Sequence, residues 1–240
     1  IRVIDLNPEK VPKFKTVRPM NAILGLTRIF LSSHKSVRVL YEAGYGVESM
    51  ILLRTQLEAM LCLLHVLGMK NDVDKIEQFA ADYEDWAYVK AKKNMDKTYD
   101  RIPKDIRRLV YSDDYRDGIN MGYDEIEDER KKALSDIRMT SFLSPEQRKE
   151  IGNKHDIGWF VDFIFSESSA RIHAVNFHEA CEQYTESDGR RVTRINFKDS
   201  EDKQANGPFI MSTFLLSLLL VQFCGFFNLP EIAMKVRSTL

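Results

Sequence analysis

Apolar residues recur every three or four positions along most of this chain, the spacing of one face of an α-helix. In the first such stretch, residues 20–43, one side carries Ile23, Leu26, Ile29, Phe30, Val37 and Leu40. Gly44 and Gly46 follow this stretch, and glycine commonly ends a helix. The pattern therefore predicts a first helix over residues 20–43.

Two further helices are predicted directly after it. Residues 47–67 are rich in leucine and end at Gly68, so we expect a central helix there. Asn71 and Asp72 can cap a third helix that continues to about residue 95. Short connections between such helices build bundles. The predicted fold class is all-α, a multi-helix up-and-down bundle.

The second half of the chain predicts further helices and one exception. Ser144 and Pro145 form a good helix start, and an aromatic-rich helix is expected over residues 159–184. A polar stretch opens at Asp188–Gly189, and its alternating apolar residues predict a short β-hairpin or a loop near residues 190–198.

Residues 205–230 contain no charged side chain. A bilayer-spanning helix needs about 20 apolar residues, so this length suffices. Interspersed hydroxyl and amide residues, the lack of flanking Lys/Arg clusters and the lack of a second such segment favour a central bundle helix instead. The apolar excess of this helix also predicts a homodimer.

Composition bounds the class of protein. With 240 residues, 44% hydrophobic and 30% charged, the chain can bury a substantial core. We expect an extended arm over residues 1–19 and a single domain over residues 20–240, with a charged helical insertion at about 97–150. The net charge of -1 argues against polyanion binding over the whole surface but allows a local basic patch.

Three widely spaced cysteines are typical of a reducing compartment and predict a cytoplasmic protein without a membrane segment. The chain starts at Ile1, so an upstream segment is an open alternative.

Arg54 and Glu58 are the first candidate site residues. They are four positions apart and so share a helix face. A structural ion pair between helices is one interpretation. In the other, Arg54 binds a carboxylate or phosphate through its planar fork while Glu58 orients it.

His173 is the second candidate. On a regular helix, Asp162, Ser166 and Ser169 fall on nearly the same side as His173, so this polar stripe could be buried beside the central helix. An imidazole exchanges protons near neutral pH, and Asp162 or a serine could orient it. A hydrogen-bonded core histidine is the structural alternative.

The sequence fits other catalytic chemistries and metal or cofactor sites poorly. Ser169 on a regular helix is badly exposed for nucleophilic attack on a substrate. No repeated Glu-x-x-His pattern, glycine-rich phosphate loop or Cys-x-x-Cys pair is present, so no metal and no cofactor is expected.

Two short motifs carry a family resemblance. They are Leu52–Glu58, with its Arg-x-x-x-Glu helix, and Ser169–His173, with Trp159 opening the later helix. On these residues the chain resembles the bacterial helical family called domain of unknown function 5677, over residues 44–184. This resemblance implies a helical fold and no known activity.

Arg171 and His178 suggest a second resemblance. Their spacing is similar to the Arg-x(4 to 6)-His motif of the prokaryotic HEPN group of ribonucleases and toxin-like domains, although Ile172 stands where a polar residue is typical. The resemblance implies metal-independent endoribonuclease activity in a toxin or phage-defence system, with Arg171 and His178 as alternative catalytic residues.

Two functions of different classes follow. The preferred one is a noncatalytic interaction or ligand-sensing module with a buried polar pocket, whose partner is RNA or another anionic ligand. The alternative is RNA cleavage, in which His173 activates the ribose 2′-hydroxyl and Arg54 stabilises the charge developing on phosphate.

Overall fold

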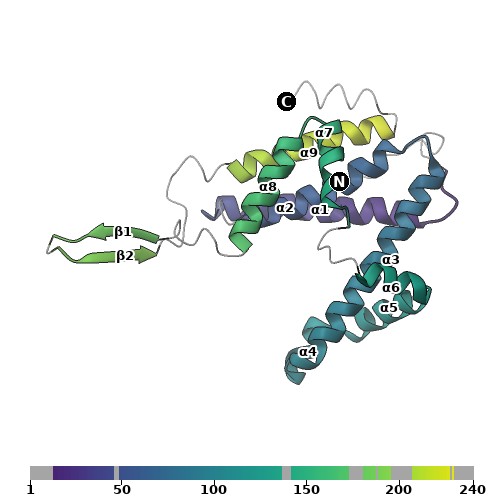
Figure 1. Ribbon diagram of the computed structural model, residues 1–240, viewed down its shortest axis with the longest axis horizontal. Coiled ribbons are helices and arrows are strands. Elements are labelled where there is room, and N and C mark those ends of the chain that lie inside the picture. Colours follow the sequence, from purple (N-terminus) through teal and green to yellow (C-terminus); the bar gives the residue numbers. More distant parts are fainter. Residues whose placement is uncertain are drawn as a thin grey trace. The chain divides into compact units, whose positions relative to one another are not determined.

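The computed structural model describes residues 13–45, 49–136, 142–172, 181–187, 189–195, 207–227 and 229. Its described helices are α1 (Arg18–Glu42), α2 (Met50–Gly68), α3 (Val73–Thr98), η2 (Tyr99–Arg101), α4 (Lys104–Val110), α5 (Asp113–Asp124), α6 (Asp128–Asp136), α7 (Pro145–Lys154), α8 (Gly158–Ile172) and α9 (Gly207–Phe226). The described strands are β1 (Cys181–Thr185) and β2 (Arg191–Ile195) (Figure 1). The all-α class predicted from the sequence is confirmed.

The chain divides into two compact units. Unit one contains residues 1–12, 23–70 and 145–240, and unit two contains residues 13–22 and 71–144. Unit two therefore includes α3 and much of the charged stretch that was expected to form an insertion. The division into an arm and a single domain stays a prediction.

In unit one, α2 is the central helix because its surface is apolar almost all round. The helices α7, α8 and α9 all pack against it (Figure 1). Leu53, Leu57 and Leu61 are completely buried. A helix that is apolar on all sides belongs in a core, which is what the leucine content predicted.

One polar group on α2 is also completely buried. Gln56 is 0% exposed, and so is Ser212 of α9. The Gln56 amide donates to the Ser212 carbonyl (3.1 Å), and the Ser212 hydroxyl donates to Gln56 Oε1 (2.5 Å). His34 Nδ1 of α1 lies 2.8 Å from Ser212 Oγ. Since that hydroxyl proton is already used, His34 Nδ1 is the donor. These hydrogen bonds offset the free-energy cost of burying the polar groups, and they join three helices.

The helix expected over residues 159–184 is shorter than predicted. Helix α8 ends at Ile172, and Cys181–Thr185 is a strand that pairs antiparallel with β2, Cys181 opposite Ile195. Gly189 supplies the left-handed backbone (φ 82°) that the hairpin turn requires. The hairpin therefore covers residues 181–195 and not 190–198, and its first strand takes the place of the end of the predicted helix, because β-branched and aromatic residues favour strands.

Two helices are long and apolar enough to cross a membrane, α2 and α9. The expectation that residues 205–230 form the sole such segment is therefore wrong. In the most apolar 18-residue segment of α2, 67% is buried, which is typical of the core helix of a globular unit. For α9 the value is 33%, and Ile210 and Phe214 are exposed. Length and composition alone do not assign α9 to a membrane.

Unit two is built on α3, against which α5 and α6 pack. As predicted, Asp72 caps α3, and its side chain accepts from the Lys75 backbone N–H at 3.2 Å. Arg130 of α6 pairs with Asp82 and with Asp85 of α3, the latter through Nε at 2.5 Å. Opposite charges therefore tie the two helices together.

Candidate functional site

Arg54 and Glu58 are paired on α2. Arg54 Nε donates to Glu58 Oε1 at 3.1 Å, and the two side chains are 20% and 26% exposed. The four-residue spacing places both on one helix face, as the sequence indicated. The pair lies at the edge of the core, where water still reaches it.

A second arginine joins this pair on the same aromatic ring. The guanidinium carbon of Arg54 lies 4.9 Å from the centroid of the Phe165 ring of α8, and that of Arg148 of α7 lies 4.1 Å from it. Both distances are within the range of cation–π contacts. We call Arg54, Glu58, Arg148 and Phe165 the guanidinium cluster.

Both signs of charge meet in the guanidinium cluster. Glu58 pairs with Arg54, and Glu58 and Glu146 both act on Arg148. Burial lowers the pKa of Arg148, nearby Glu58 and Glu146 raise it, and nearby Arg54 lowers it. An arginine stays protonated in a protein, so Arg148 is a half-buried cation close to a second one.

Cys62 lies one turn beyond Glu58 and does not act as a nucleophile. Burial, together with nearby Glu58 and against the opposing effect of Arg148, raises its pKa to about 12. The side chain therefore remains a neutral thiol at physiological pH, whereas nucleophilic cysteines are thiolates.

The polar stripe predicted on α8 is not the buried one. Asp162 and Ser166 are exposed, and Ser169 is half-buried. Ser168 is 0% exposed instead, and its hydroxyl donates to the Ile164 carbonyl at 2.6 Å. The larger apolar side chains decide which face is buried, and these are Phe160, Val161 and Ile164. A serine that bonds to its own helix can be buried among them at low cost.

The remaining predicted site residues are at or beyond the end of α8. His173 and His178 lie outside the described residues, and so does the side chain of Arg171. The structure thus brings Arg54 and Glu58 together with α8, while the meeting of Arg54 and His173 stays a prediction.

A cleft of about 230 Å³ lies between the end of α2 and α7. Its lining includes His65, Glu150, Lys154 and His155. Burial lowers the pKa of both histidines. Lys154 lies in the last turn of α7, where a basic side chain balances the exposed carbonyl groups. That structural role accounts for Lys154, and the carbonyl ends of the helices disfavour an anion in this cleft.

Sequence reasoning missed Arg148, Phe165 and His155. Arg148 belongs to a short, highly polar helix, and only the packing of α7 against α2 and α8 shows that it meets Arg54. The sequence could have indicated Phe165, since this residue precedes the candidate Ser169 by one turn within an aromatic-rich helix. Among the residues that the structure describes, no group of three or more His, Cys, Asp or Glu side chains could hold a metal ion.

Comparison with known proteins gives one match. The model of a family described as Family of unknown function (DUF5677) matches residues 20–190, which is more than half of the chain. Neither a curated protein nor a solved structure gives a significant match.

Proposed function

We propose that this chain, which belongs to the family of unknown function DUF5677, is a noncatalytic binding module that recognises an anionic group at the guanidinium cluster. The observation that carries the proposal is the convergence of two guanidinium groups, from α2 and α7, on the Phe165 ring. A structural ion pair would need only one of them.

The chemistry of arginine defines the ligand. A guanidinium presents several N–H donors in one plane, which match two oxygens of a carboxylate or a phosphate. Glu58 occupies Arg54 Nε and so fixes the orientation of that fork. Partial burial strengthens the attraction, since the effective dielectric constant is lower than in water. The ligand group is therefore a carboxylate or a phosphate.

Calorimetric titration of the full chain with citrate and with pyrophosphate tests this proposal. Arg148→Met removes the charge and keeps an apolar chain against Phe165. We expect it to weaken binding of the tighter ligand about tenfold or more, the size of a lost charge-assisted hydrogen bond. Lys149→Met is the matched control, because the exposed Lys149 is the next residue on α7 and is not part of the cluster. Equal losses in both variants, or no binding by the parent protein, would refute the proposal.

The alternative function is metal-independent RNA cleavage in a toxin or phage-defence system. Its support is the spacing of Arg171 and His178 and the placement of a cation at Arg54. Incubation of the protein with labelled RNA in the presence of a chelator tests it. Cleavage that is lost in Arg171→Ala and His178→Ala, or in His173→Ala, would replace the binding function with an enzymatic one.

Two further parts of the proposal concern the state of the protein. A homodimer is supported by α9, which carries no charged residue and exposes Ile210 (64%) and Phe214 (49%). A cytoplasmic location away from membranes is supported by the free thiols of Cys62 and Cys224. Light scattering after size-exclusion chromatography measures the first, and partition between the soluble and membrane fractions measures the second.

A further inference from the structure

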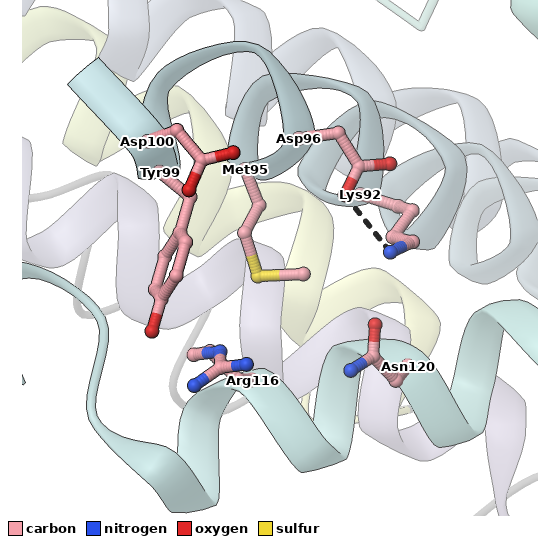
Figure 2. A pocket seen from close by; sticks show the side chains of 7 residues that line it. All are labelled: Lys92, Met95, Asp96, Tyr99, Asp100, Arg116 and Asn120. Atoms are coloured by element: carbon pink, nitrogen blue, oxygen red, sulfur yellow. Dashed lines mark hydrogen bonds and ion pairs between the residues drawn. The ribbon is translucent and has the colours of Figure 1, made fainter.

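A cavity of about 310 Å³ lies in unit two, between α3 with η2 on one side and α5 on the other (Figure 2). Met95 of α3 lies in the middle of its wall and is 4% exposed. The Tyr99 ring stands beside Met95. These two side chains give the cavity an apolar surface among otherwise polar groups. Its volume is near the lower limit for small-molecule sites.

Both signs of charge face this cavity. Lys92 and Asp96 form an ion pair at 2.9 Å, and Asp96 remains 59% exposed. Asp100 lies beside Tyr99 and is 91% exposed. On the opposite side, Arg116 is half-buried and lies 4.4 Å from the Tyr99 ring centroid. Outside the lining, Arg116 Nη1 lies 3.6 Å from Asp113 Oδ1, and Asp100 Oδ1 lies 3.9 Å from Arg107 Nη1. The charges of the lining sum to zero: the side formed by α3 and η2 has a net charge of -1 because Lys92 offsets one of its two carboxylates, and the α5 side carries Arg116.

Asn120 offers unused hydrogen-bonding capacity. It is four residues after Arg116, so both project from the same face of α5 toward α3 (Figure 2). Its side chain is half-buried and has no hydrogen-bond partner among the residues that the structure describes. A side-chain amide has two donors and one acceptor oxygen, so Asn120 can donate to or accept from a ligand in the cavity.

We propose that this cavity binds a free α-amino acid. The carboxylate of the ligand accepts hydrogen bonds from Arg116 and Asn120, and its ammonium group donates to Asp96. Its side chain packs on Met95 and on Tyr99. A simple anion would meet the carboxylates of the lining and a simple cation would meet Lys92 and Arg116, so a zwitterion is the best complement.

This site is independent of the function proposed above. All residues that line it belong to unit two, whereas the guanidinium cluster belongs to unit one. Arg148→Met should therefore leave amino-acid binding unchanged. Failure of one proposal does not imply failure of the other.

Calorimetric titration of the full chain with each of the common amino acids, up to about 10 mM, tests the inference. We expect at least one to bind. The amide and the N-acetyl derivative of the tightest ligand should each bind at least about tenfold more weakly than the amino acid, because each lacks one of the two charges. Absence of binding by every amino acid, or equal binding of either derivative, would overturn the inference.

Variants then locate the site. Arg116→Met and Asn120→Asp should each weaken binding about tenfold or more, the second because it places a carboxylate against the ligand's own. Arg108→Met is the matched control, since Arg108 also pairs with Asp113 but is 84% exposed and lies outside the cavity. If the control weakens binding as much as Arg116→Met does, the cavity is not the site. Circular dichroism establishes that each variant is folded.

Discussion

The hydroxyl of Ser212 tests how the buried polar network joins α1, α2 and α9. In Ser212→Ala, Gln56 Oε1 loses its donor in a place that water does not reach, since Gln56 is 0% exposed. An unsatisfied buried acceptor costs about 1–3 kcal/mol. His34 is half-buried and can turn its Nδ1–H to water, so it adds little. We expect a decrease in the free energy of unfolding of about 2 kcal/mol.

Urea unfolding followed by circular dichroism measures this change. Ser217→Ala is the matched control, because Ser217 is on the same helix, is 8% exposed and donates only to the Thr213 carbonyl of its own helix. Removal of the Ser217 hydroxyl should lower the free energy of unfolding by less than about 0.5 kcal/mol. Replacing both partners, as in Gln56→Leu with Ser212→Ala, should restore much of the stability, because no unpaired group remains. Equal destabilisation by the two serine variants would refute the reasoning.

Further predictions concern pH and two glycines of α5. Burial holds the pKa of His34, His65 and His155 below the ordinary value of 6.5. These histidines therefore bind protons more readily in the unfolded chain. Their contribution to the free energy of unfolding is fully present above about pH 6.5 and is lost as the pH falls through their lower pKa values in the folded state. Urea midpoints at pH 7.5 and 5.5 should differ in that direction, and equal midpoints would contradict it. A Cβ atom on Gly122 would lie 2.4 Å from Tyr88 Cε1, so Gly122→Ala should destabilise by about 1–3 kcal/mol. Gly118 has open space there, and Gly118→Ala should stabilise by up to about 1 kcal/mol in the same thermal-unfolding assay.

Much of the fold could be predicted from the sequence because helix signals are local. The apolar spacing of the first three helices, the glycine that ends α2 and the Asp72 cap all act within a few residues of chain. Observed boundaries differ from the predicted ones by about three residues, as expected where helix ends fray. The end of α8 was missed because Cys181–Thr185 also fits a helical pattern, and pairing with β2 decides its state.

The site was less predictable because it depends on which helices meet. Arg54 and Glu58 lie on one helix, so their spacing fixes their contact. The contacts of Arg148 and Phe165 join three helices, and a single sequence without related chains gives no pairing information. On α8 the prediction followed polar residues, whereas the apolar stripe that includes Ile164 sets the buried face.

A binding function for this protein requires that the two guanidinium groups on Phe165 hold one anion together. Nuclear magnetic resonance of the arginine Nε–H groups during a titration with pyrophosphate and citrate tests it most directly. We predict that the Arg54 and Arg148 signals shift together and saturate at the same ligand concentration. If the ligand binds while both signals stay unchanged, the anion is held elsewhere and the guanidinium cluster is structural.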